Sequence, residues 1–513
     1  MTAWSGGYVS DIPYTAGFYR ETAPSHISFA LAVQGMRLPP FGPGSTYCEL
    51  GCGQGFGTNL LAAANPLAKF WGIDFNPAQI ANAETLASEA RLKNVTFLDW
   101  SFEQTLSRTK ELPQFDMIVL HGIYSWISES NRQAIVTLLD QILKPGGVVY
   151  ISYNCMPGWA VMAPFQRLLF EHAQRNPDQS DVQIRAAIEF ATTLKRKGAQ
   201  YFASNPGVAP RIERMEGLST TYLAHEYLNG HWHPLYHSDV ARELAPARLT
   251  YVGSATIAEN IDAVAVPPEL MEAVSGVRDR TWQETIRDYI SNKQFRRDLF
   301  IRGPSALNKL ELSRALLSQK LCLAVPGSAV TFRFQGPLSD VVGQEEVYRP
   351  IVQTLGNDVK SIGQLLAVPE LGKIGLSLLV QAISLLVHSG QVLPVIAESQ
   401  NREGSIARNF NKVVALKIKS GYAMSSLAAP VAGTAIGATY TDLIAVLGLI
   451  ELPRADADAL TRRGWEVMKE TGQRLLKGGS VLQTDEENIS ELKHQMTVFL
   501  TEKAPIWRCL GVI

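Results

Sequence analysis

The first 165 residues predict an α/β fold with a doubly wound, mostly parallel sheet, on two observations. Short apolar runs rich in β-branched and aromatic residues alternate with segments that have helical spacing. The turn signal Lys144-Pro145-Gly146-Gly147 separates the last helical segment from the last of these runs. Alternation of strands and helices is typical of right-handed βαβ units, which build a parallel sheet.

The elements of this region follow in order along the chain. The apolar runs predict five strands, at Thr46–Leu50, Lys69–Ile73, Val95–Leu98, Phe115–Leu120 and Gly147–Tyr153. Helices are expected between them, at Thr58–Ala64, Pro77–Arg91 and Asn131–Leu143. The stretch from Gly158 to about Asn229 is helical without strands, which predicts an insertion. A sixth strand is expected at Leu249–Ile257, and Phe295–Gly303 is predicted to supply a last strand at the edge of the sheet.

After Pro304 the sequence changes in kind and predicts an α+β region. Three helices, at Glu345–Leu355, Ser361–Leu366 and Gly375–Val387, precede a strand-like run and suggest a winged-helix-like module. The expected organisation is therefore a ligand-binding core at 1–157, the helical insertion at 158–230, completion of the sheet at 231–303, the winged-helix-like module at 304–400 and a C-terminal domain at 401–513.

Composition excludes several classes of protein. The 513 residues carry a formal net charge of −1, so there is no overall attraction to nucleic acid or anionic lipid, and a nucleic-acid partner is not expected. The start of the chain lacks the basic and apolar regions of a secretory signal. The apolar stretch Ile374–Val387 is too short to span a bilayer, so no membrane insertion is expected. Five cysteines without a CxxC pair suit a reducing cytosol, which predicts a cytoplasmic protein.

The most informative stretch is the glycine-rich run from Tyr47 to Gly57. A strand ends close to Glu49, and Gly51, Gly53 and Gly55 alternate before a helix, as in a loop that lets backbone amides approach a ligand. The dinucleotide fingerprint fails in both registers, because its third glycine would fall on Phe56 or Thr58. A Walker loop is excluded because no Gly-Lys-Ser/Thr follows. The remaining pattern, E-x-G-x-G-x-G, closely resembles the first motif of the class I S-adenosylmethionine-dependent methyltransferases.

This resemblance implies roles for residues that follow the next three strands. Asp74, with Phe75 beside it, ends the second strand and would accept the ribose hydroxyls of S-adenosylmethionine. Asp99 and Trp100 follow the third strand and would contact the adenine. His121 follows the fourth strand and would lie beside the methionine arm of the cofactor.

Further motifs narrow the family. They are HGIYSWI after the fourth strand, YNCMPGW after the fifth, and downstream YLAHEYLNGHWHPLYHSDVARELAPARLTYVGSA and QFRRDLFIRG. Together they resemble the bacterial methyltransferases with a methyltransferase regulatory domain, which include the rickettsial-type protein-lysine methyltransferases. The resemblance covers residues 1–303 by motif and implies a cytosolic enzyme, a homodimer, that methylates lysines of a protein substrate. The family pattern has Asn-Thr and an aromatic residue before Pro-Gly-Trp, whereas here Cys155 and Met156 follow Asn154, which loosens the inference about the acceptor.

The acceptor site is predicted from position and chemistry. Loops after neighbouring parallel strands meet at one edge of the sheet, where substrate meets cofactor. Aromatic rings there would exclude water from a lysine amine and favour the cationic product. The residues expected to surround the methyl group are Tyr14, Tyr124, Trp126, Tyr153 and Trp159.

Several alternatives stay open. His225, His231, His233 and His237 suggest a metal, but no cysteine or suitably spaced acid completes a zinc pattern, so none is expected. The acceptor could be a small metabolite, or the chain could be a cofactor-sensing binding protein. Self-association through the insertion is predicted because it has apolar residues at helical spacing and little sequence left to bury them internally; they are Phe165, Leu168, Leu169, Ile184, Ile188 and Leu194.

Overall fold

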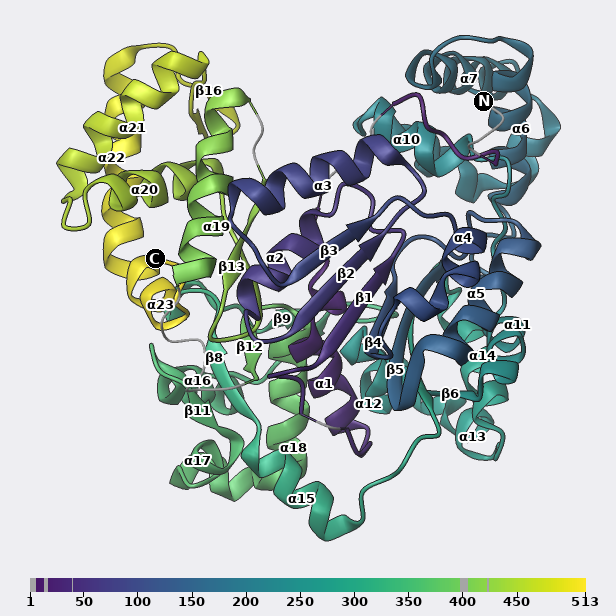
Figure 1. Ribbon diagram of the computed structural model, residues 1–513, viewed down its shortest axis with the longest axis horizontal. Coiled ribbons are helices and arrows are strands. Elements are labelled where there is room, and N and C mark those ends of the chain that lie inside the picture. Colours follow the sequence, from purple (N-terminus) through teal and green to yellow (C-terminus); the bar gives the residue numbers. More distant parts are fainter. Residues whose placement is uncertain (1–5, 13–16, 39, 397–404, 422–423) are drawn as a thin grey trace.

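A seven-stranded sheet forms the centre of the computed structural model, which describes residues 6–12, 17–38, 40–396, 405–421 and 424–513 (Figure 1). The strand order is β3-β2-β1-β4-β5-β7-β6, and β7 alone runs antiparallel to its neighbours. The predicted doubly wound, mostly parallel sheet is therefore confirmed. The strands are β1 (Thr46–Leu50), β2 (Lys69–Ile73), β3 (Val95–Leu98), β4 (Phe115–Leu120), β5 (Leu143–Asn154), β6 (Leu249–Ser254) and β7 (Phe295–Arg302).

The end of the sheet differs from the prediction in two ways. The strand predicted at the edge, β7, lies between β5 and β6, so that β6 is the edge strand. The chain reaches this arrangement because it returns through a helix after β6 and pairs antiparallel with both neighbours. Strand β5 begins at Leu143 and not at Gly147, since the predicted turn is a bulge within its pairing with β4.

Helices cover both faces of the sheet, because side chains alternate in direction along each strand and both sets are apolar. Helices α1 and α2 pack in one layer with Tyr47 and Phe70, and α5 and α11 pack in the other with Cys48 and Ile118. The helices of this domain are α1 (Pro24–Val33), α2 (Phe56–Ala64), α3 (Pro77–Glu89), α4 (Phe102–Ser107), α5 (Glu129–Ile142), α11 (His237–Leu244), α12 (Asp262–Ala265), α13 (Met271–Ser275) and α14 (Arg280–Ser291).

The helical insertion has a hydrophobic core of its own. Phe165, Leu169 and Ile184 are fully buried in a cluster formed by the insertion and Val9. The expectation that these apolar positions lack an internal core is therefore wrong, because the short helices at the end of the insertion fold back over the long ones. The helices are α6 (Ala163–Arg175), α7 (Ser180–Arg196), α8 (Gln200–Ser204), α9 (Ala209–Met215) and α10 (Thr220–Tyr227).

The C-terminal half contains the three predicted helices, α16 (Glu345–Leu355), α17 (Ile362–Leu366) and α18 (Pro369–His388). They pack with a three-stranded antiparallel sheet of β11 (Lys360–Ser361), β8 (Lys320–Leu323) and β12 (Val392–Val395). Helix α18 starts earlier than predicted, because a non-helical residue, Gly375, joins two helical pieces. It is the single helix among the described residues that is long and apolar enough to cross a membrane, and half of its apolar window is buried inside the protein.

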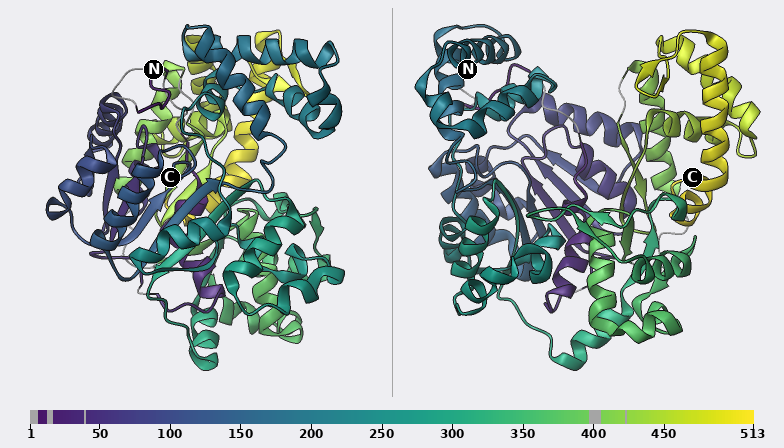
Figure 2. Two further views of the ribbon diagram at one scale, coloured as in Figure 1. Left: turned by 90° about the vertical axis from the view of Figure 1, so that its right-hand side faces the viewer. Right: turned by 180° about the vertical axis from the view of Figure 1, so that it is seen from behind.

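The rest of this half packs against the central sheet on the side of α2. One hydrophobic core joins α2 to α19 and the β13–β14 hairpin, and the side-chain amide of Asn65 donates to the carbonyl of Gly433 at 2.9 Å. Figures 1 and 2 show α19–α22 and the insertion at opposite ends of the molecule. The remaining elements are α15 (Lys309–Ser318), β9 (Arg333–Phe334), β10 (Val341–Val342), α19 (Ser405–Leu416), β13 (Ser426–Ala429), β14 (Thr434–Gly437), α20 (Tyr440–Glu451), α21 (Ala457–Thr471), β15 (Leu476–Lys477), β16 (Ser480–Val481), α22 (Asp485–Val498) and α23 (Ala504–Cys509).

Candidate functional site

A cavity of about 690 Å³ opens at the carboxyl ends of β1, β2 and β4. Ligands of open α/β sheets bind there, where the strand order reverses between β1 and β4. Eight of the nine residues predicted to hold the cofactor line it: Glu49, Gly51, Gly53, Gly55, Asp74, Phe75, Trp100 and His121. The size is within the range of ordinary small-molecule sites, about 300–1,000 Å³.

The glycine loop is built from backbone conformations that favour glycine. Gly51, Gly53 and Gly55 have φ values of 73°, 54° and 65°, in the left-handed region. The amide of Gly51 donates to the carbonyl of Ile73 at 2.7 Å, and the amide of Gly53 donates to Asp74 Oδ2 at 2.9 Å. The loop is thereby tied to the end of β2, and its backbone forms the floor of the cavity.

Replacing Gly55 with alanine is expected to lower the free energy of unfolding by about 2–4 kcal/mol. A Cβ at Gly55 would lie 2.5 Å from the Cβ of Ala83 and 2.7 Å from the ring of Phe97, and φ there is positive. Gly57 is the matched control, because its Cβ would meet no atom closer than 3.8 Å and it lies within α2. Gly57→Ala should change stability by less than about 1 kcal/mol in urea denaturation. Equal effects of the two substitutions would contradict the close packing described for Gly55.

Asp74 is a buried carboxylate held by the backbone. Its Oδ1 accepts a hydrogen bond from the amide of Asn76 at 2.9 Å, as Oδ2 does from Gly53. Burial raises its pKa. Each oxygen keeps further acceptor capacity, so the group can receive ligand hydroxyls in the cavity that it lines.

Two other titratable groups of the loop are partly buried. Burial raises the pKa of Glu49 to about 7, and the hydroxyl of Thr58 donates a hydrogen bond to its carboxylate. Burial also raises the pKa of Cys52 well above its ordinary value, so this residue is a neutral thiol. A neutral thiol without an adjacent base is not an activated nucleophile.

His121 is a neutral ring between two tyrosines. It stacks on Tyr19 with ring centroids 3.8 Å apart, and its Nδ1 lies 2.9 Å from the hydroxyl of Tyr150. Burial, and after it the positive charge of Arg297, lower its pKa to about 3. The imidazole is therefore uncharged at neutral pH and is a poor proton acceptor.

The N-terminal segment closes one side of the cavity. The carbonyl of Gly7 accepts from the amide of Gly230 at 2.8 Å, and the amide of Val9 donates to Asn229 Oδ1 at 2.9 Å. These bonds hold the segment against the end of the insertion. Tyr8, in the middle of this segment, lines the cavity with its ring centroid 6.0 Å from that of Phe75, and Tyr19 lines it as well.

The cavity extends beyond the glycine loop into a second half, which we call the aromatic chamber. Two of the residues predicted for the acceptor, Trp126 and Trp159, line it. The N-terminal segment, from which the sequence predicted Tyr14, supplies Tyr8 and Tyr19. Further residues come from α9, α10 and β7, which sequence reasoning did not select for the acceptor. The aromatic chamber is lined by Tyr8, Tyr19, Trp126, Trp159, Arg211, Tyr222, Glu226, His231, Phe295 and Arg297.

Tyr124 and Tyr153 are not in the chamber, and their predicted place around the methyl group is wrong. The hydroxyl of Tyr124 donates to Glu243 at 2.7 Å, and that of Tyr153 donates to Asp298 at 2.5 Å. Both rings are buried within the core below β4 and β5. Alternation along β5 explains Tyr153, because its neighbour Ser152 faces His121 instead. Tyr14 lies outside the described residues.

Asp99 is also misplaced by the sequence prediction. Its side chain is exposed and does not line the cavity, whereas the four residues after it do. The short strand β3 ends one residue before Asp99, and the chain then turns so that the following residues face inward. Those residues are Trp100, Ser101, Phe102 and Glu103.

The four histidines that suggest a metal lie in different surroundings. His237 is fully buried with its Nδ1 2.9 Å from Asp298, while His231 lines the aromatic chamber. Within the described ranges, no three His, Cys, Asp or Glu side chains form a group that could hold a metal ion.

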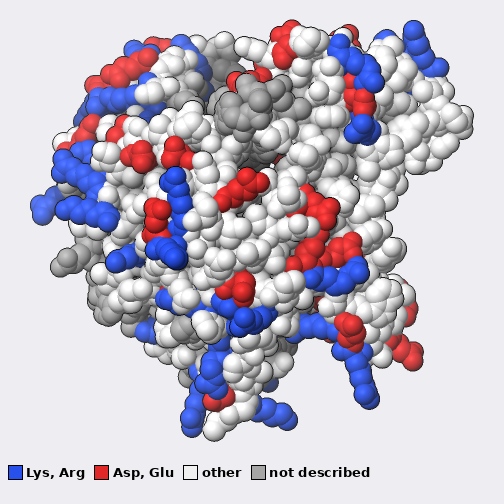
Figure 3. All heavy atoms as spheres, turned by 45° about the vertical axis from the view of Figure 1, so that its right-hand side comes forward, with Lys and Arg blue, Asp and Glu red and all other residues white. Residues whose placement is uncertain are grey.

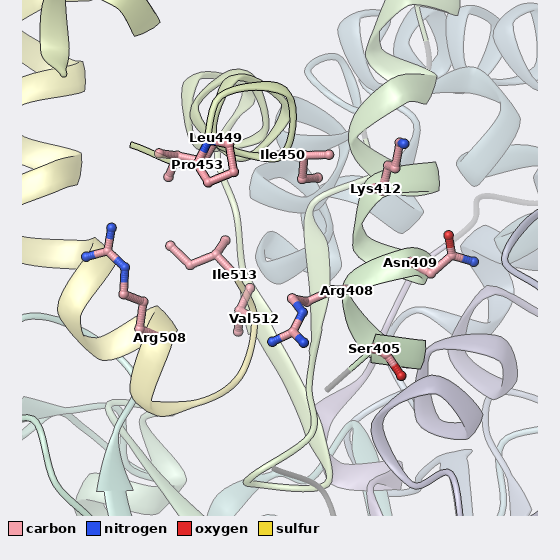
Figure 4. A pocket seen from close by; sticks show the side chains of 10 residues that line it. All are labelled: Ser405, Arg408, Asn409, Lys412, Leu449, Ile450, Pro453, Arg508, Val512 and Ile513. Carbon is pink, nitrogen blue, oxygen red and sulfur yellow. The ribbon is translucent and has the colours of Figure 1, made fainter. Parts of the chain in front are cut away.

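A second cavity, of about 570 Å³, lies within the C-terminal half between α19, α20 and α23 (Figure 4). Three cationic side chains, Arg408, Lys412 and Arg508, surround apolar residues that include Leu449 and Ile513. No residue of the central sheet lines it. It is therefore separate from the site at the strand ends.

The sheet order, the glycine loop after β1 and the acid that ends β2 define a class I S-adenosylmethionine-dependent methyltransferase. A methyltransferase-domain family model matches residues 42–205, and a predicted methyltransferase regulatory domain model matches residues 219–302. The chain belongs to the methyltransferases that carry this regulatory domain. The second match spans α10 through β7, so it includes the last two strands of the sheet and only the end of the insertion.

Similar proteins cover the whole chain. The uncharacterized protein sll1526 of Synechocystis is 38% identical over 510 residues, which are 99% of each chain. The structure of PKMT2 from Rickettsia typhi, in complex with AdoHcy, is similar with a TM-score of 0.70 at 19% identity, over 98% of this chain and 99% of that one. This likeness shows a shared fold that includes the C-terminal half. A trans-aconitate 2-methyltransferase of Yersinia pestis is 30% identical over 174 residues, which are 34% of this chain and 59% of that protein.

Proposed function

We propose that this protein transfers methyl groups from S-adenosylmethionine to lysine side chains of a protein substrate. The observation that carries the proposal is the aromatic chamber, which continues the cofactor cavity and brings four or more rings around one space. Rings exclude water from an amine and so lower its pKa, which favours the neutral nucleophile. Their faces also attract the methylated cation.

The cofactor's place follows from the residues that line the other half of the cavity. Asp74 would receive the ribose hydroxyls, Trp100 would lie against the adenine, and the backbone of Gly51 and Gly53 would approach the methionine end. When bound, the cofactor supplies a methyl group already activated by a sulfonium. The chain's own task is then to align a neutral amine and to keep water out.

A macromolecular acceptor is supported by how the chamber is built. Two of its walls come from the insertion and the N-terminal segment, which are far larger than a lid over a small ligand needs to be. The resemblance to the rickettsial-type protein-lysine methyltransferases, and the PKMT2 structure, support the same acceptor. On the face in Figure 3, basic and acidic side chains are interspersed without a broad basic field, which does not favour nucleic acid.

One observation favours a small acid as a second candidate acceptor. Two guanidinium groups, those of Arg211 and Arg297, line the chamber and could bind carboxylates. Part of the chain is also similar to trans-aconitate 2-methyltransferase.

Incubation of the purified protein with S-adenosylmethionine labelled in its methyl group and a bacterial lysate is expected to label protein, at lysine. The label should appear as methyllysine after acid hydrolysis. A labelled small product would support the second candidate instead, and no transfer at all would favour a cofactor-sensing protein. Protein carrying Asp74→Ala serves as the control for background transfer.

The proposal includes a homodimer and a cytoplasmic location. Large apolar side chains stay exposed on the insertion, at Val161, Val182, Phe190 and Leu218, which supports a homodimer that light scattering would test. None of the five cysteines forms a disulfide, which supports a reducing, cytoplasmic setting.

A further inference from the structure

Among the described residues that line the aromatic chamber, Glu226 on α10 supplies the one carboxyl group. Tyrosines from three places surround it. Tyr222 lies one turn earlier on the same helix, and burial, followed by the charge of Glu226, raises its pKa to about 12. Burial and then the Glu226 charge also raise the pKa of Tyr19, and burial, Asp74 and Glu226 raise that of Tyr8. The carboxyl group therefore lies between the cofactor half and the outer wall of the chamber.

Glu226 has no hydrogen bond or ion pair with another of the described residues. The nearest opposite charge is Arg211, which is engaged elsewhere: its Nε donates to the hydroxyl of Tyr227 at 3.1 Å, and its guanidinium lies 5.4 Å from the centre of the Trp159 ring. Burying a carboxylate without a partner is costly, so such a group in a cavity wall is suited to a cationic ligand.

We infer that Glu226 binds the ammonium group of the incoming lysine and takes its proton before methyl transfer. This rests on the proposed lysine-methylating function. One N–H bond of the ammonium breaks, its electron pair stays on the nitrogen as the nucleophilic lone pair, and the proton forms an O–H bond on the Glu226 carboxylate. The resulting carboxylic acid returns the proton to water after the acceptor leaves, so no further reactant is needed.

The other titratable groups at the cavity are less suited to this step. His121 has its pKa lowered to about 3 by burial and by Arg297, and its Nδ1 already contacts Tyr150. Glu49 lines the cofactor half of the cavity, not the aromatic chamber, and its carboxylate already accepts a hydrogen bond from the hydroxyl of Thr58. Tyr8, Tyr19 and Tyr222 are protonated at neutral pH, so they can donate to the amine or orient it but cannot take its proton.

The charges around Glu226 set the pH range of the step. Burial raises its pKa to about 7, and Arg211 on α9 acts against the rise. The other groups that face the chamber are Tyr8, Tyr19, Tyr222, His231 and Arg297, with Asp74 beyond Tyr8. The carboxylate must be ionised to take a proton. Turnover should therefore rise with pH as Glu226 ionises and level off above about 7 to 8.

The first test is the variant Glu226→Gln, which keeps the shape of the side chain and removes its charge. Its kcat for methyl transfer to protein should fall on the order of 100-fold, while affinity for S-adenosylmethionine stays within about twofold. The acid limb of the pH profile should disappear, and Glu226→Asp should restore part of the rate. The control is Glu216→Gln, which makes the same change at an exposed residue outside the cavity. It should leave kcat and the pH profile of turnover unchanged.

The second test does not depend on turnover. Calorimetry with n-butylammonium, in the presence of S-adenosylhomocysteine, should show binding to the wild type at pH 8 that weakens at least tenfold at pH 6. Glu226→Gln should bind it at least tenfold more weakly than the wild type at pH 8, with an unchanged thermal unfolding temperature. If Glu226→Gln turned over and bound n-butylammonium as well as the wild type does, the inference would be overturned, while the proposed lysine methylation would be unaffected. Failure of the wild type to label protein would instead overturn the proposed function.

Discussion

Replacement of Arg296 by methionine is expected to lower the free energy of unfolding by about 3–5 kcal/mol, because it leaves buried carboxylates without their cation. Arg296 is 2% exposed. It donates to Asp288 Oδ1 at 2.5 Å, to Asp298 Oδ1 at 2.9 Å and to Glu284 Oε2 at 2.8 Å. This group joins β7 to α14, and through Asp298 it also holds His237 and Tyr153.

The stability lost in Arg296→Met should be smaller at acidic than at alkaline pH. Burial acts to raise the pKa of Asp298, but the Arg296 charge overcomes it and holds the value at about 2. A folded-state pKa below the unfolded value, about 3.9, contributes stability that is complete above pH 4 and is lost as the pH falls toward 2. Without Arg296, burial would raise the pKa of Asp298, and the pKa of Asp288, which burial already raises to about 6 against the Arg296 charge, would rise further. Protonation of these carboxylates then removes their unpaired charge. The loss in free energy of unfolding caused by Arg296→Met should therefore be smaller at pH 5 than at pH 8.

Urea denaturation at the two pH values measures this, with Arg333→Met as the control. Arg333 pairs with Asp340 on the surface, with side chains 72% and 46% exposed. An exposed pair contributes about 0–1 kcal/mol, so that variant should lose little at either pH. If Arg296→Met lost no more than Arg333→Met, the buried cluster would not be the stabilising unit described.

Replacement of Asp74 by alanine is expected to weaken S-adenosylmethionine binding at least tenfold. Charge-assisted hydrogen bonds contribute about 1.5–3 kcal/mol each, and the variant loses those to the proposed ribose hydroxyls. It also removes the acceptors of the Gly53 and Asn76 amides, which order the glycine loop. Both effects act in the same direction.

Calorimetry measures the affinity, and Asp99→Ala is the matched control. Asp99 is an exposed acid after the neighbouring strand β3 and does not line the cavity, so its removal should change affinity by less than about twofold. A loss at Asp99 equal to that at Asp74 would restore the sequence-based assignment of Asp99 to the adenine. Circular dichroism of both variants should match the wild type.

The strands β1 to β4 and the cofactor half of the site follow from local sequence. The bounds of these four strands are as predicted, because each is a short apolar run that ends in a turn signal. A residue directly after a parallel strand must lie at the carboxyl edge, so Gly53, Asp74 and His121 could be assigned from the order of the chain. Asp99 shows where this reasoning fails. It directly follows β3 but its side chain is exposed, whereas the next residue, Trp100, lines the cavity.

The aromatic chamber was decided by tertiary structure. Its walls combine residues as far apart in the chain as Tyr19, Tyr222 and Arg297, and no local spacing relates them. The motif YLAHEYLN contains Tyr222 and Glu226, but a short helix does not show which of its faces will meet a cavity.

Side-chain direction within strands was likewise beyond the sequence. Arg296 and Asp298 point into the core and Arg297 points into the cavity, because alternate residues of β7 face opposite sides of the sheet. The same alternation sends Tyr153 into the core and Ser152 toward His121. The sequence by itself determined the sheet and the cofactor edge, since these depend on neighbours in the chain. The tertiary structure decided which side chains face the acceptor, through the antiparallel position of β7 between β5 and β6 and through the packing of the helical insertion. Both depend on contacts between segments distant in the chain.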